Sequence, residues 1–268
     1  MNRPFLFGTN FKMNQTPSES ATFYTDLASS VEIPPGVKLF IIPPFTSLGA
    51  VAQVAQDGPD DLWLGAQNVH WASEGAYTGE ISVSMLVALG VDLVLLGHAE
   101  RRRDFHENDV DLNKKVHAVL DAGMRVLLAV GETAEERAFG VSEETVARQL
   151  KIALHGVAAA RHAVPSLQIA YEPVWSIGAG GTPAHPEDVE PIAGSIRAAL
   201  TDLLGEPGSN VPILYGGSVD PSNAGSFNAL PDIDGLFVGR AAWTIAGFLA
   251  TYQAGLTGRI AGDRVSAE

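Results

Sequence analysis

The sequence contains no cysteine, which excludes disulfide bonds, thiolate nucleophiles and cysteine-ligated metal sites together. It also holds few basic residues, because 17 Lys and Arg stand against 31 Asp and Glu and give a formal charge of −14. Binding a polyanion needs a basic surface, so this balance argues against a nucleic-acid partner. A small phosphate is still compatible, provided that backbone N–H groups and a few cations hold it locally.

Long apolar segments are missing as well. No stretch reaches the roughly 20 uninterrupted apolar residues that a membrane span needs. The most apolar region, residues 85–96, is interrupted by Gly90 and Asp92. The apolar run near Met1 is too short for a secretory signal. We therefore expect a cytoplasmic protein without a membrane partner.

What the chain does contain is a regular alternation of short apolar runs and helical patterns. The runs predict strands at 5–8, 37–42, 62–66, 93–97, 125–130, 167–171, 211–215 and 235–238. Spacing and caps predict helices at 18–30, 47–55, 82–89, 110–122, 142–160, 186–204, 221–228 and 245–254. The alternation predicts an α/β fold, a single (β/α)8 barrel over residues 1–268 with a frayed tail at 257–268. An open, doubly wound sheet is the alternative.

In a barrel, functional side chains gather at the carboxyl ends of the strands. The strand predicted at 167–171 ends on Glu172, which Pro173 follows at once. Glu172 is therefore either a catalytic base or a residue that only caps a turn. The following apolar tip lies between a proline and several glycines, a composition that suits a lid; the lid residues are Pro173, Val174, Trp175, Ser176, Ile177, Gly180 and Gly181.

Polar side chains follow two other predicted strands. Asn10 and Lys12 lie two residues apart after the first, so they share one side of an extended segment and can hold an anion together. His98 follows the strand at 93–97 and precedes a predicted helical turn whose positive end keeps the ring neutral. Glu100 is a candidate to support Lys12. The plainer interpretations are a solvated lysine and a structural histidine.

Two glycine turns follow the last two predicted strands. Gly216 and Gly217 precede Ser218, and Gly239 precedes Arg240, each before a helix start. Such turns form nests of N–H groups for an anion, at the place where barrels often hold a phosphate. The sequence has no histidine pair, acidic cluster or Walker-type loop with suitable spacing, so we expect no metal and no cofactor.

Eight segments, in order NFKMN, GAQNV, GAYTGEIS, LLGHAERR, AVGET, AYEPVWSIG, LYGGSV and DGLFVG, resemble the triosephosphate isomerase family over nearly the whole chain. The resemblance implies a (β/α)8 barrel that isomerises a small phosphosugar without a cofactor. It also implies a homodimer in which the loop from Gly75 to Glu80 reaches the partner's active-site region.

The resemblance further implies roles for the residues at the strand ends. Glu172 would be the general base and His98 would move protons between the two substrate oxygens, while Lys12 and Asn10 stabilise the enediolate. The phosphate would bind backbone N–H groups at Gly178, Ser218, Gly239 and Arg240. Closing the lid would exclude water from this site.

Two positions depart from the usual pattern of the family. Gly181 stands where a lysine is usual, and Arg240 replaces the second of two glycines. Together with NVHWASEGAYTGEIS and GRAAW, these departures resemble a bacterial branch that handles erythrulose phosphates in tetritol catabolism. They favour conversion of L-erythrulose 1-phosphate to D-erythrulose 4-phosphate. The glycolytic triose phosphate reaction is the alternative, and a barrel that only binds sugar phosphates is a third.

Overall fold

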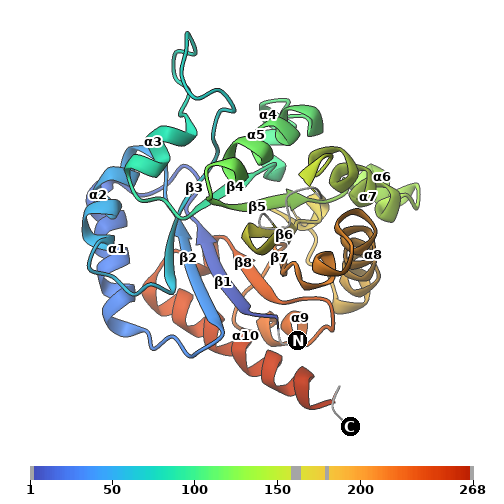
Figure 1. Ribbon diagram of the computed structural model, residues 1–268. Helices are drawn as coiled ribbons and strands as arrows, with labels where there is room; N and C mark the ends of the chain where they lie inside the picture. The colour runs from blue at the N-terminus through green and yellow to red at the C-terminus, as the bar shows by residue number, and fades with distance from the viewer. Residues whose placement is uncertain (1–2, 158–163, 179–180, 266–268) are drawn as a thin grey trace.

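The computed structural model describes residues 3–157, 164–178 and 181–265. Its strands pair in parallel and in chain order, and β8 pairs with β1, which closes the barrel (Figure 1). The strands are β1 (Phe5–Asn10), β2 (Val37–Ile42), β3 (Leu62–Ala66), β4 (Leu93–Leu96), β5 (Arg125–Val130), β6 (Leu167–Tyr171), β7 (Ile213–Tyr215) and β8 (Gly235–Val238). The predicted (β/α)8 barrel is confirmed, and the open sheet is wrong. β7 begins after Pro212, which has no N–H to donate.

Helices surround the barrel, as the outer ring in Figure 1 shows. They are α1 (Pro17–Ser30), α2 (Phe45–Ala55), α3 (Val83–Ala88), α4 (Ala99–Asp104), α5 (Asp109–Asp121), α6 (Ala134–Ala138), α7 (Ser142–Ala153), α8 (Pro186–Leu204), α9 (Ala224–Asn228) and α10 (Ile245–Val265). α7 ends before the predicted limit, and residues 158–160 of that prediction lie outside the described residues. The prediction that the chain frays from residue 257 is wrong, because α10 continues to Val265. Arg259 fastens this last part by donating to the backbone oxygen of Ile233 over 3.0 Å.

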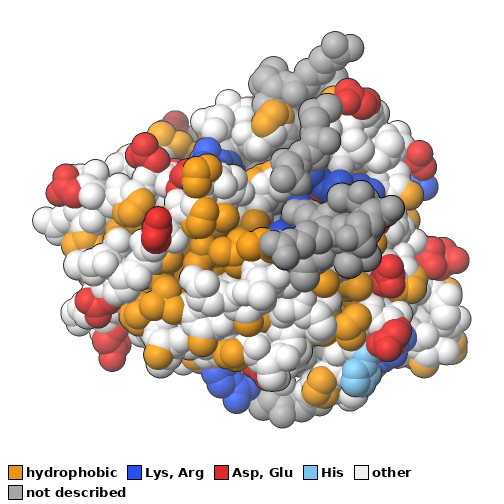
Figure 2. Space-filling model, turned by 90° about the horizontal axis from the view of Figure 1, so that it is seen from below, with side chains coloured by type: hydrophobic (Ala, Val, Ile, Leu, Met, Phe, Trp, Pro, Cys, Tyr) orange, Lys and Arg blue, Asp and Glu red, His pale blue; other side chains and the backbone are white. Residues whose placement is uncertain are grey.

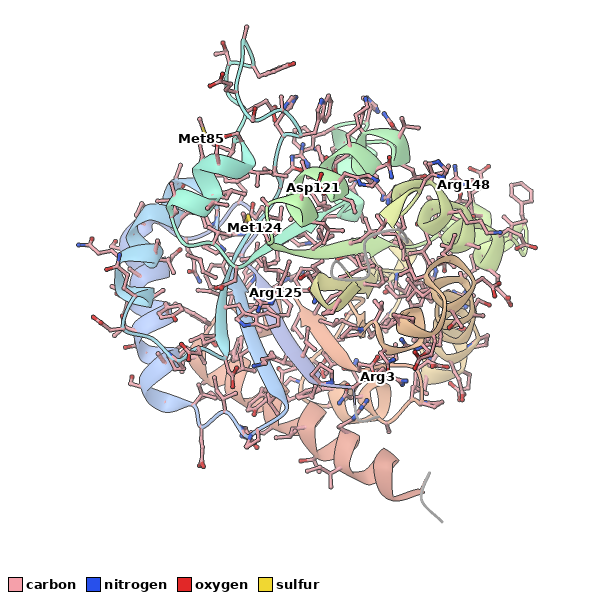
Figure 3. All side chains as sticks on the ribbon, in the orientation of Figure 1. Arg3, Met85, Asp121, Met124, Arg125 and Arg148 are labelled. Atoms are coloured by element: carbon pink, nitrogen blue, oxygen red, sulfur yellow. The ribbon has the colours of Figure 1, made fainter. Side chains whose placement is uncertain are left out.

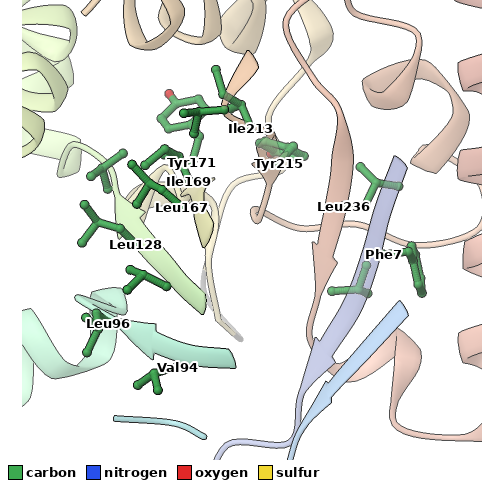
Figure 4. Close-up of a cluster of buried hydrophobic side chains, with 14 of the residues drawn as sticks. Phe7, Val94, Leu96, Leu128, Leu167, Ile169, Tyr171, Ile213, Tyr215 and Leu236 are labelled. Carbon is green, nitrogen blue, oxygen red and sulfur yellow. The ribbon is translucent and has the colours of Figure 1, made fainter. Parts of the chain in front are cut away.

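The strands alternate between a filled interior and an outer face that packs against the helices. In Figure 4, Leu167, Ile169 and Tyr171 of β6 lie beside Ile213 and Tyr215 of β7, within the cluster between the strands and the surrounding helices. The other set of side chains fills the barrel; it includes Leu6, Phe40, Leu127, Ala170 and Phe237. The same period of two places Asn10 in line with Leu6, and Glu172 in line with Ala170, at the carboxyl ends of β1 and β6.

Charged side chains close the amino-terminal end of the barrel. The Arg125 guanidinium lies 4.3 Å from the centre of the Trp63 ring, which is itself buried. Arg3, which precedes β1, donates to Asp234 over 2.6 Å. Figure 3 labels both arginines. This end of the barrel is therefore packed and charged.

The outer surface agrees with the acidic composition. On the face seen in Figure 2, hydrophobic side chains gather near the middle and acidic side chains are scattered around them, without a broad basic patch. Among the helices that the structure describes, none is long and apolar enough to cross a membrane.

Candidate active site

A cavity of about 700 Å³ opens at the carboxyl ends of the strands. It is lined by the residues that the sequence singled out on five different strand ends: Asn10, Lys12, His98, Glu172, Gly178, Ser218, Gly239 and Arg240, with Glu100 beside Lys12. Residues up to 230 positions apart in the chain thus meet in one place. Ser176 and Ile177 of the predicted lid also line the cavity. The other described lid residues, Pro173, Val174, Trp175 and Gly181, do not line it, and Gly180 lies outside the described residues.

Glu172 is buried at the cavity wall, with 3% of its surface exposed. Its Oε2 accepts the backbone N–H of Ala99 over 3.2 Å, and its Oε1 lies 3.5 Å from Nε2 of His98. The backbone of Glu172 continues the sheet for one residue, because its N–H donates to Val130 over 2.8 Å. The carboxylate is therefore held by the sheet and directed into the cavity.

His98 caps the first turn of α4. The chain can turn into this position because Gly97 adopts φ +74°, in the left-handed region that favours glycine. The Nδ1 atom of His98 accepts the N–H of Glu100 over 3.2 Å. A nitrogen that accepts carries no proton, so this contact requires the tautomer with the proton on Nε2. A neutral ring then presents an N–H donor toward Glu172 and the cavity.

Lys12 and Asn10 form the third side of the cavity. The Lys12 ammonium pairs with Glu100 Oε1 over 2.7 Å. The side-chain oxygen of Asn10 accepts the Lys12 N–H over 2.8 Å. The Nδ2 group of Asn10 has no acceptor within the described part of the chain. A cation and an amide donor are therefore available to an oxygen atom bound in the cavity.

The glycine turns contribute unpaired backbone donors. Among the described residues, the N–H groups of Gly178, Ser218 and Arg240 have no acceptor. The Arg240 side chain is exposed at the rim of the cavity. A dianionic phosphate would receive these N–H groups together with one guanidinium, which fits the predicted anion nest.

The lid begins with a single turn, η3 (Val174–Ser176), directly after Pro173. The indole N–H of Trp175 donates to Glu132 over 2.6 Å, and the Arg137 guanidinium lies 3.8 Å from the Trp175 ring. At Gly181, an added Cβ would lie only 2.6 Å from the carbonyl carbon of Ser176. The lid therefore folds back on itself too closely for the lysine that is usual at position 181.

Glu132 was not predicted from the sequence as a site residue, although it lies within the AVGET motif. Its buried carboxylate accepts bonds from the Trp175 indole and from the Tyr171 hydroxyl. Burial raises its pKa above the ordinary value of 4.5, and the bonds from Trp175 and Tyr171 and the charge of Arg137 oppose that shift. Ionisation of Glu132 is therefore less favourable in the folded protein than in the unfolded chain.

A pH-dependent stability difference follows from this raised pKa. The stability that Glu132 contributes is present below about pH 4.5 and is lost as the pH rises through the folded-state pKa. Glu132→Gln keeps the shape without the charge. We expect the variant to melt a few degrees above the wild type at pH 8 and at the same temperature at pH 4. Thermal scans of both proteins at both pH values measure this, and equal melting temperatures at pH 8 would contradict it.

One further cavity residue, Trp243, was not predicted from the sequence. Trp243 lines the cavity and donates its indole N–H to the backbone oxygen of Asn10 over 2.9 Å. The motif GRAAW was noted in the sequence, but no pattern in it showed that its tryptophan would reach the end of β1.

A closed (β/α)8 barrel with its polar cavity at the carboxyl ends of the strands defines the class of barrel enzymes. More narrowly, the chain belongs to the triosephosphate isomerase family, whose family model matches residues 5–255. Its relatives are isomerases, and this chain is an isomerase of the same family.

Relatives with two different names are equally similar to the chain. An L-erythrulose-1-phosphate isomerase of Rhizobium etli is 43% identical over 243 residues, covering 90% of this chain and 89% of the relative. A triosephosphate isomerase of Carboxydothermus hydrogenoformans is 43% identical over 251 residues, covering 93% and 98%. A triosephosphate isomerase of Chloroflexus aurantiacus is 42% identical over 250 residues, covering 93% and 98%. Overall identity therefore does not separate the two substrates.

Proposed function

We propose that the protein converts L-erythrulose 1-phosphate to D-erythrulose 4-phosphate through an enediolate. The observation that carries the chemistry is the convergence of a buried carboxylate, a neutral histidine and a lysine on one cavity. Glu172 removes the proton from the carbon beside the carbonyl and returns it to the neighbouring carbon. The bonding electrons move onto the carbonyl oxygen and then back, so no oxidant or cofactor enters the reaction.

The other cavity residues stabilise the intermediate. The Nε2–H of His98 donates to the oxygen that gains charge, and His98 then passes a proton between the two substrate oxygens. Lys12 and the Nδ2 group of Asn10 offset the developing negative charge. The unpaired N–H groups of Ser218 and Arg240 hold the phosphate. Closure of the lid keeps water away from an enediolate that could otherwise expel phosphate.

Arg240 supports the choice of the four-carbon substrate. L-Erythrulose 1-phosphate is dihydroxyacetone phosphate with an added hydroxymethyl group at the carbon far from phosphate, so the reacting atoms need the same catalytic groups. Arg240 adds an exposed cation at the phosphate turn where the family usually has glycine. That departure favours the larger sugar over the triose, whereas overall identity to relatives of the two kinds is equal.

We also infer a homodimer formed through the loop from Gly75 to Glu80. This loop stands out from the barrel between β3 and α3 in Figure 1, and residues 73–80 are exposed. Met13, next to Lys12, is 94% exposed. A partner's loop over the Lys12 segment would cover both surfaces. The mass of the purified protein in solution tests this inference, and a monomer would contradict it.

The substrate is tested by comparing kcat/KM for L-erythrulose 1-phosphate and glyceraldehyde 3-phosphate in the same preparation. We expect a preference of about tenfold or more for the tetrulose phosphate, because one added carbon in a pocket commonly contributes that much discrimination. A preference for the triose would make the protein a triosephosphate isomerase. Phosphate binding without turnover of either sugar would support a barrel that only binds sugar phosphates.

A further inference from the structure

Trp243 connects the phosphate turn after β8 with the segment that carries Lys12. Its indole N–H donates to the backbone oxygen of Asn10 over 2.9 Å. Its own backbone oxygen accepts a longer bond of 3.4 Å from the side chain of Gln15. One tryptophan therefore contacts this segment on both sides of Lys12.

The segment that Trp243 contacts has a strained backbone. Lys12 has φ +53° and Gln15 has φ +70°. These values lie in the left-handed region, which residues other than glycine adopt only at a cost in free energy. Such a conformation persists only where the surroundings hold it. The Lys12 N–H donates to the side chain of Asn10 over 2.8 Å, and the Lys12 backbone oxygen accepts from Gln67 over 2.7 Å.

Asn10 links Trp243 to the strained backbone at Lys12. The side-chain oxygen of Asn10 accepts the backbone N–H of Lys12, and the backbone oxygen of Asn10 accepts the indole N–H of Trp243. Trp243 therefore holds Asn10 in place, and Asn10 in turn holds Lys12. The β1–β8 ladder ends at Thr9 and Val238, one residue before Asn10. The indole N–H of Trp243 thus adds one hydrogen bond beyond the end of the β1–β8 pairing. Trp243 also ends the turn η5 (Arg240–Ala242), because its N–H donates to the Arg240 backbone oxygen over 3.2 Å.

We propose that Trp243 is a positioning residue that sets where the Lys12 ammonium and the Asn10 amide meet the charge of the enediolate. This inference rests on the proposed isomerase function. A donor aimed at charge that appears only in the transition state affects kcat more than the binding of the substrate. Because the phosphate is held by other groups, loss of the Trp243 bond should leave KM nearly unchanged.

Trp243→Phe tests the proposal, since phenylalanine keeps an aromatic ring and lacks the N–H donor. We expect kcat to fall about 10- to 100-fold, as small misplacements of catalytic groups do, with KM nearly unchanged. Trp63→Phe is the matched control, because Trp63 lies at the amino-terminal end of the barrel under Arg125. The control should lower the melting temperature and keep the wild-type kcat. A wild-type kcat in Trp243→Phe would overturn the proposal.

Amide hydrogen exchange tests the positioning role of Trp243 independently of the proposed isomerase activity. The backbone amides of residues 11–16 should exchange faster in Trp243→Phe than in the wild type, and Trp63→Phe should leave them unchanged. If the wild type isomerises neither sugar phosphate, the proposed function fails, and exchange alone then decides whether Trp243 holds the segment. Unchanged exchange in Trp243→Phe would overturn the positioning role whatever the activity.

Discussion

Glu172→Gln should lower kcat about 10²- to 10⁴-fold on whichever sugar phosphate the enzyme turns over. Glutamine has the shape of glutamate and can still accept the Ala99 N–H that now lies 3.2 Å from Oε2. It cannot take a proton from carbon. The loss should therefore appear in the chemical step, measured as kcat, while the melting temperature and the affinity for inorganic phosphate stay close to those of the wild type.

Glu172→Asp is the matched control for this variant. Aspartate keeps the carboxylate and withdraws it by one methylene, so it tests the position of the base rather than its presence. We expect a smaller loss than with glutamine, because a misplaced base still accepts a proton. A glutamine variant with wild-type turnover would show that Glu172 is not the base.

Much of the candidate site could be predicted because it depends on strand ends. All the short apolar runs except 37–42, which Pro43 follows, end at or directly before a polar residue or a glycine, and in a parallel barrel all such ends meet at one face. The period of two along β1 and β6 then turns Asn10 and Glu172 inward. Local composition and one topological rule were enough to bring these residues together. Their catalytic roles remain predictions.

The contacts that organise the site could not be predicted in this way. Trp243 reaches Asn10 across 233 positions, and Trp175 reaches Glu132 across 43, by the orientation of single side chains. Such contacts follow from packing, which no local pattern encodes. The length of α10 was misjudged for the same reason: its last turns are held by Arg259 against the backbone at Ile233, a contact made only in the folded barrel.

Asp234→Asn should destabilise the protein by about 3–5 kcal/mol, the usual cost of leaving a buried charge without its partner. The Asp234 side chain is fully buried directly before β8. Arg3 and Arg197 each donate to it over 2.6 Å, and Arg259 approaches it at 3.3 Å. Asparagine keeps the size but removes the one charge that faces all three guanidinium groups. At about 2–4 °C per kcal/mol for a chain of this size, the melting temperature should fall by about 6–20 °C.

The Lys38–Asp61 pair provides the control, because both of its side chains are about one-third exposed, at 33% and 36%. Asp61→Asn should cost no more than about 1 kcal/mol, since water screens and replaces an exposed ion pair. Equal melting temperatures for Asp234→Asn and Asp61→Asn would show that the buried charge of Asp234 stabilises the protein no more than the exposed charge of Asp61.

Asp234 lies at the amino-terminal end of the barrel and the cavity opens at the other end. Asp234→Asn should therefore keep the wild-type kcat per folded molecule. Glu172→Gln should show the reverse pattern. If Asp234→Asn also lowered kcat, or if Glu172→Gln also lowered the melting temperature, the two ends of the barrel would be coupled.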